Sequence, residues 1–177
     1  MNRELLEKQL NELPIAQYEF FETSELEFAQ RIRMICETEC PRYGKTWACP
    51  PAVGTVAECK ARCLTYPQGL LITSLQEVSS ISHMEECLAT RGVHEAMTQE
   101  VIGLLNAQGL EVYGLSTESC ALCKECTYPN APCRHKDQML PCLESHGIVV
   151  TTLADKYGIE YLYGPQVVTW FSVLLFR

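Results

Sequence analysis

Apolar positions that recur at spacings of three and four residues occupy several stretches of the chain, and this period predicts amphipathic helices. The predicted helices span residues 1–13, 24–36, 55–64 and 84–108, with short helices near Leu143 and over 153–157. Two of the helices begin with the pattern of a capping box, Ser24 with Glu27 and Thr55 with Glu58. Gly109 is the residue type that often follows a helix end, whereas Gly92 could divide the longest helix.

Shorter apolar runs bounded by Gly and Pro predict strands. They span residues 16–21, 69–75, 110–115, 161–163 and 167–176, with Gly164-Pro165 as the turn between the last two. The strands alternate with helices, and neither a repeat nor a linker interrupts them. The pattern therefore predicts a single α+β domain over residues 1–177, in which helices cover a mixed or antiparallel sheet. The order of the strands does not follow from the sequence.

Composition narrows the class of protein. The chain has 177 residues, of which 47% are hydrophobic, and this is enough for a continuous core. Its formal net charge of −8 argues against binding to nucleic acid or to an anionic membrane surface, where basic patches supply most of the attraction.

The compartment is predicted from the N-terminus and from the cysteines. The stretch MNRELLEKQLNELP is charged and lacks the apolar core of a signal peptide, and the run VVTWFSVLLF is too short to span a bilayer as a helix. We therefore predict a cytoplasmic protein. Thiols stay reduced in the cytoplasm, so the eleven cysteines indicate metal ligation or redox chemistry rather than a disulfide framework.

Cys120, Cys123 and Cys126 form a C-x-x-C-x-x-C triplet, the strongest chemical signal in the chain. Bacterial ferredoxins hold three corners of a [4Fe–4S] cluster with this spacing. Zinc sites more often use two separated C-x-x-C pairs, or cysteines with histidines. The triplet therefore favours iron–sulfur over zinc. For the fourth corner we favour Cys133 over Cys49, although Cys49-Pro50 matches the cysteine–proline that ends the ferredoxin motif.

Cys36, Cys40 and Cys49 form a less standard first group within CETECPRYGKTWACPP. If Cys36 and Cys40 end a helix, they share one face of it, and the proline-rich loop could return Cys49 to the same point. Three thiolates can hold a cluster and leave one iron open to a substrate. The alternative is that these cysteines are zinc ligands or that they supplement the second group.

The two groups supply seven candidate ligands for the eight corners of two clusters. The candidates for an eighth ligand are Cys142, Cys59, Cys63 and His146. Cys59 and Cys63 lie four residues apart on a predicted helix, so we expect them in the core, where free cysteine packs as a small hydrophobe. Cys87 is also expected to pack. Arg134 and its neighbours could raise the potential of a cluster, or could form a solvated basic turn.

The two blocks CETECPRYGKTWACPP and CALCKECTYPNAPCRHKDQMLPCLESHGIVV together resemble a family of cysteine-rich prokaryotic proteins described as predicted metal-binding proteins of unknown function. The resemblance rests on Tyr43-Gly44, on Trp47 followed by Cys49-Pro50-Pro51, on the C-x-x-C-x-x-C triplet and on Pro132-Cys133-Arg134. It implies metal binding through these cysteines: Cys36, Cys40, Cys49, Cys120, Cys123, Cys126 and Cys133. It implies no reaction. Cys142 departs from the family pattern, in which serine is expected.

The sequence thus predicts a metal-binding protein with one or two [4Fe–4S] clusters that exchange electrons with a redox partner protein. One alternative is an iron–sulfur enzyme whose open iron acts on a small-molecule substrate. The other is a structural zinc protein that serves as an interaction module. Whether the chain is an enzyme, and its oligomeric state, stay open at this stage.

Overall fold

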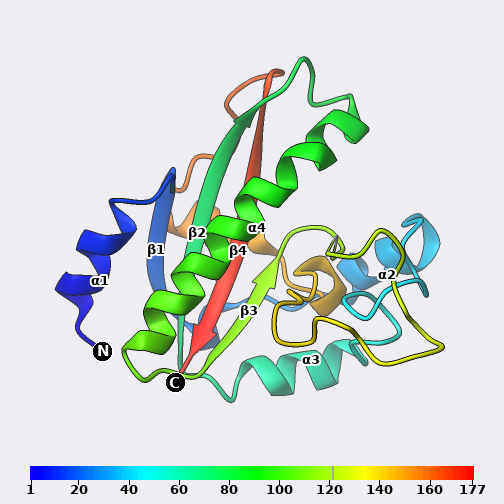
Figure 1. Ribbon diagram of the computed structural model, residues 1–177, viewed down its shortest axis with the longest axis horizontal. Coiled ribbons are helices and arrows are strands. Elements are labelled where there is room, and N and C mark those ends of the chain that lie inside the picture. Colours follow the sequence, from blue (N-terminus) through cyan, green and yellow to red (C-terminus); the bar gives the residue numbers. More distant parts are fainter. Residues whose placement is uncertain (121) are drawn as a thin grey trace.

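The computed structural model describes residues 1–120 and 122–177 and contains one four-stranded antiparallel sheet. The order of its strands is β1-β2-β4-β3. The central strands are β2 (Gln68–Glu77) and β4 (Val167–Phe176), and the edge strands are β1 (Gln17–Glu22) and β3 (Val112–Ser116) (Figure 1). This arrangement confirms the predicted α+β class.

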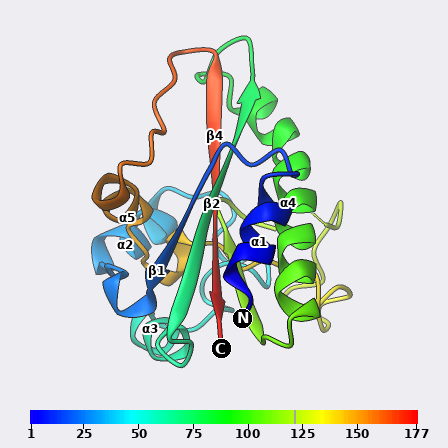
Figure 2. The same cartoon turned by 90° about the vertical axis from the view of Figure 1, so that its left-hand side faces the viewer.

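Helices cover both faces of the sheet (Figure 2). One face packs against α1 (Arg3–Leu10) and the long α4 (Met84–Ala107). The other side carries α2 (Gln30–Thr38), α3 (Val56–Cys63) and α5 (Val150–Tyr157), together with the short 3-10 helices η1 (Thr23–Glu25) and η2 (Glu144–His146). Gly92 does not divide α4, and Gly109 follows it with φ +81°.

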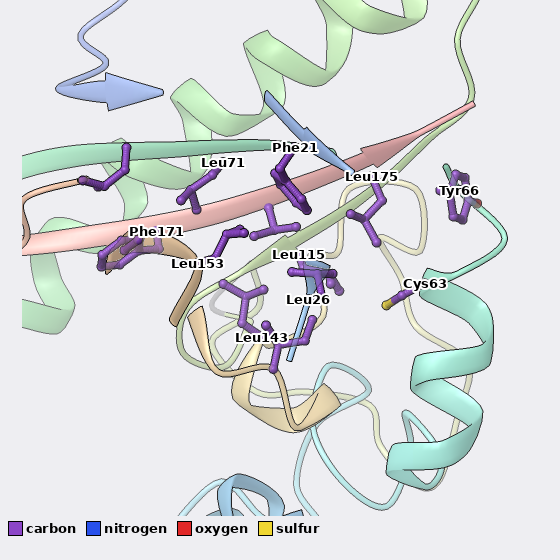
Figure 3. Close-up of a cluster of buried hydrophobic side chains, with 14 residues drawn as sticks. Phe21, Leu26, Cys63, Tyr66, Leu71, Leu115, Leu143, Leu153, Phe171 and Leu175 are labelled. Atoms are coloured by element: carbon purple, nitrogen blue, oxygen red, sulfur yellow. The ribbon is translucent and has the colours of Figure 1, made fainter. Parts of the chain in front are cut away.

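The central strands are buried on both faces, which explains their continuous apolar sequences. Leu70 and Leu174 pack toward α1 and α4, whereas their neighbours Leu71 and Val173 pack on the opposite side, around α5 and η2 (Figure 3). Gly69 of β2 leaves room for the ring of Phe21 on the neighbouring strand β1, because a Cβ at this position would lie 2.2 Å from Cζ of Phe21.

Two elements differ from the sequence prediction. The helix expected after Ser24 begins only at Gln30, because Phe28 pairs with Ile148 in a β-bridge and the amide of Ala29 donates to the carbonyl of Gly147. These long-range contacts keep the backbone extended where the capping pattern predicted a helix. The predicted capping box at Thr55 and Glu58 does open α3.

The predicted strand over 161–163 is irregular in the structure. Tyr161 instead packs its ring against Phe171 at a centroid distance of 5.9 Å, and its carbonyl accepts a hydrogen bond from the hydroxyl of Thr169. Side-chain packing has replaced backbone pairing here. Among the helices of the described residues, none combines the length and the apolar character needed to cross a membrane.

Candidate metal centre

Two long loops carry most of the cysteines, and they lie against each other on the α2 and α3 side of the sheet (Figure 1). The first cysteine loop, residues 39–55, joins α2 to α3, and the second cysteine loop, residues 117–143, joins β3 to η2. The hydroxyls of Thr46 and Ser119 lie 3.2 Å apart, and the indole N–H of Trp47 donates to the carbonyl of Ala131. The ring of Trp47 also packs edge-on against Tyr128 at 4.9 Å. These contacts bring the two loops together.

The four cysteines of the second group line one cavity: Cys120, Cys123, Cys126 and Cys133. All four are half-buried, and Trp47, Arg134 and His135 complete part of the wall. The guanidinium of Arg134 donates to the carbonyl of Glu125, which ties the two ends of this segment together. The cavity is narrow, about 20 Å³, so the loop would have to open to admit a cluster.

Cys49, the competitor for the fourth corner of the second group, lines a different cavity. This second cavity, of about 320 Å³, lies between the end of α2, the first cysteine loop and the segment that leads into η2. It contains all three cysteines of the first group, and Cys142 and Glu144 lie in the same wall. Cys36, Cys49 and Cys142 are buried, whereas Cys40 is half-buried.

Within residues 1–120 and 122–177, no set of three or more His, Cys, Asp or Glu side chains is arranged to hold a metal ion. The thiols instead share the walls of two cavities. The chemistry of these donors nevertheless suits iron–sulfur clusters, which are held by cysteine thiolates. Ligation by the seven predicted cysteines therefore stays a prediction, whereas their gathering into two groups of neighbours is a feature of the fold.

Burial favours the protonated thiol at two cysteines of the first group, Cys36 and Cys49, in the metal-free chain. It raises the pKa of Cys36 to about 11, with a smaller contribution from the negative charge that Cys40 and Glu144 can carry. Burial also raises the pKa of Cys49, and the hydrogen bonds from Ser119 and Thr46 partly oppose this effect. Since only thiolates ligate metals, binding must release protons and must strengthen as the pH rises.

A buried ion pair lies close to Cys120. Arg91 is only 5% exposed and pairs with Glu95 at 2.9 Å. Burial raises the pKa of the Cys120 thiol, and the backbone amide of Leu122 lowers it. The charge of Glu95 raises this pKa more than the cation of Arg91 lowers it. Among the described residues, the buried Nε of Arg91 has no hydrogen-bond partner. The pair therefore places both signs of charge near the second group, with one guanidinium donor unused.

The other candidates for an eighth ligand already make packing contacts or hydrogen bonds with other residues. Cys63 packs in the apolar cluster of the sheet (Figure 3). The thiol of Cys59 donates to the carbonyl of Val53 at 3.4 Å. His146 is fully buried, with Nδ1 2.9 Å from the carbonyl of Cys142 and Nε2 2.8 Å from the hydroxyl of Tyr113. Both ring nitrogens are therefore occupied. Cys87 packs beside Trp170, as expected.

Sequence reasoning missed Glu144, Arg91 and a third cavity. Glu144 lies outside both cysteine groups along the chain, and Arg91 lies on α4, far along the chain from either group. The third cavity, of about 420 Å³, adjoins the second group through Cys133 and Trp47, and its polar wall includes Arg62, Tyr113 and Lys136. No local pattern marks these residues, because the tertiary fold assembles them.

One of three comparisons with known proteins found a match. A search of curated proteins and a search of solved structures each found no match. The model of one family, DUF2284, described as predicted metal-binding protein, matches residues 19–176 and so includes both cysteine loops, most of β1 and all of β2, β3 and β4. The chain belongs to this family of predicted metal-binding proteins.

Proposed function

We propose that the protein is a cytoplasmic iron–sulfur protein that holds [4Fe–4S] clusters on its two cysteine groups and exchanges electrons with a redox partner. The observation that carries the proposal is the shared cavity of Cys120, Cys123, Cys126 and Cys133. The first three have the spacing of a ferredoxin cluster motif, and the fourth comes from the far end of the same loop segment. Zinc on the same cysteines is the alternative.

The residues around the second group have roles that suit this function. A bound [4Fe–4S] cluster supplies a redox centre that gains or loses one electron. The four cysteines would hold it as thiolates, while Arg134 in the same cavity wall places positive charge nearby, which favours the reduced state. Trp47 lines the cavity and packs edge-on against Tyr128, and we expect the two rings to limit the access of water to a cluster.

Anaerobic purification followed by metal and sulfide analysis tests the proposal. We expect brown protein with the broad visible absorption of iron–sulfur clusters and about four iron and four sulfide for each cluster. Cys133→Ser should lower the iron content by the amount that one cluster contributes. Colourless protein that contains stoichiometric zinc, without iron or sulfide, would rule the proposal out in favour of a structural zinc site.

A second candidate function, the conversion of a small anionic substrate, is favoured by the third cavity. Its volume of about 420 Å³ and its largely apolar wall are typical of small-molecule sites. Arg62 and Lys136 supply positive charge, and Cys133 lies in the same wall. Arg62 donates to the hydroxyl of Tyr113 at 3.2 Å, and that hydroxyl lies 2.8 Å from Nε2 of His146. A substrate here would lie beside the second cysteine group.

Benzoate, an aromatic carboxylate, is a suitable probe of this cavity. In Trp170→Phe the one remaining tryptophan is Trp47, which lines the cavity, so its fluorescence reports binding directly. We expect a saturable change, at least about tenfold weaker after Arg62→Gln, because a paired charge contributes more than 1 kcal/mol to binding. Benzyl alcohol is the neutral control. A titration with no saturation, or equal binding of both compounds, would exclude an anion site.

A further inference from the structure

We infer that Cys142 is the fourth thiolate ligand of the first cysteine group, so that the chain carries two sites of four cysteines each. This inference rests on the proposed function and extends it to the cavity that contains Cys36, Cys40 and Cys49. The same cavity wall includes the side chain of Cys142, which lies more than ninety residues further along the chain. The seven cysteines predicted from the sequence become eight.

The backbone holds Cys142 next to Cys49. The amide of Cys142 donates to the carbonyl of Ala48 at 3.1 Å, and Ala48 directly precedes Cys49. The hydroxyl of Ser145 donates to the same carbonyl at 3.2 Å. On the other side, Cys142 forms a parallel β-bridge with Ser116, at the end of β3. The position of Cys142 is therefore fixed between the sheet and the first cysteine loop.

The four thiols of this cavity lie in one wall. As thiolates they would repel one another, and this arrangement is costly unless a bound cation or cluster compensates them.

Glu144 is the rival ligand within this cavity. The thiol of Cys142 donates to Oε2 of Glu144 at 2.8 Å, so a carboxylate oxygen and a sulfur lie side by side. Iron–sulfur clusters take thiolate ligands, whereas carboxylates suit harder metals. The donor set of the cavity therefore assigns the ligand role to Cys142 and leaves Glu144 as its hydrogen-bond acceptor.

Iron content and the electron paramagnetic resonance spectrum of three variants test the assignment. Cys142→Ser should lose about half of the iron of the wild-type protein, or change the spectrum of one of its two clusters. Cys59→Ser is the matched control, because Cys59 is a buried cysteine near the same loop that lies outside the cavity wall. Glu144→Gln should keep both clusters. Full iron with an unchanged spectrum in Cys142→Ser overturns the inference, as does loss of iron from Glu144→Gln alone.

A second measurement leaves Cys142 intact and applies even if its variant does not fold. In Cys123→Ser/Cys126→Ser, which disables the second group, the first site is loaded anaerobically with iron and sulfide and then oxidised mildly. A cluster with four thiolates should keep its fourth iron. Conversion to the [3Fe–4S] form, seen as its oxidised-state resonance, would mean an open iron and would overturn the inference. Wild-type protein without any iron or sulfide would instead remove the proposed function itself.

Discussion

His94 lies at the centre of a buried set of hydroxyl groups between α4 and the sheet. Its Nδ1 lies 2.8 Å from the hydroxyl of Ser74 and its Nε2 lies 2.9 Å from that of Ser172. Thr98 and Ser116 extend the set through Ser172. The apolar period of α4 does not reveal this burial, because it does not show which polar side chains the sheet offers as hydrogen-bond partners. The hydroxyls of β2 and β4 make its burial possible.

His94 should make the protein acid-sensitive. Burial lowers its pKa from 6.5 to about 4, so below pH 6.5 the unfolded chain binds a proton that the folded chain does not. The resulting stability is complete above pH 6.5 and is lost as the pH falls toward 4. Between pH 7 and pH 5 the loss should be about 2 kcal/mol of unfolding free energy.

Urea denaturation at pH 7 and at pH 5 measures this effect. His94→Gln should reduce the difference between the two pH values by about 2 kcal/mol, since the variant has no imidazole to protonate. His83→Gln, which removes an exposed histidine, is the matched control. An unchanged difference in His94→Gln would contradict the assignment of the acid sensitivity to this residue.

At the scale of elements, the sequence patterns correctly predicted those helices and strands whose structure depends on residues close together along the chain. Thr55 and Glu58 form their capping box in α3, and the apolar runs of β2 and β4 form the two central strands. The capping pattern at Ser24 failed because Phe28 and Ala29 pair with the distant segment around Gly147. A backbone hydrogen bond to a remote segment outweighs a local capping preference, and a sequence window does not contain it.

The cysteine loops also combine features that local spacing predicted with one that depends on distant contacts. The spacing of Cys120, Cys123 and Cys126 predicted a common site, and these three thiols do line one cavity with Cys133. For Cys142 the sequence offered only its nearness to the second group along the chain. The structure instead places it with Cys49, because the bridge to Ser116 and the hydrogen bond to Ala48 direct it there.

At the scale of the whole molecule, the two cysteine loops form a joined layer on one side of the sheet. Trp47 connects the loops through its hydrogen bond to Ala131, and Cys142 connects them to β3. Neither loop contains much regular structure of its own. A metal bound by either group should therefore stabilise the folded chain as a whole, because the unfolded chain has no assembled site.

Removal of the metal should consequently lower the melting temperature. We expect an anaerobic chelator to lower it by at least about 5 °C relative to untreated protein, since structural metals contribute several kcal/mol to folding. Thermal unfolding followed by circular dichroism measures the shift. Cys123→Ser/Cys126→Ser, with one group disabled, should show a smaller shift. Equal melting temperatures with and without metal would mean that the loops are held by protein contacts alone.

The sequence by itself determined the α+β class, most of the helices and strands, and the resemblance to a metal-binding family, because periodicity and close spacing are local properties. It could not determine the strand order, the burial of His94 or which cysteines lie beside Cys142. Each of these depends on contacts between segments that are distant along the chain. The tertiary structure alone decided that Cys142 lines the cavity of the first group. Folding sets the distances between the thiols, and those distances decide which cysteines can share a metal.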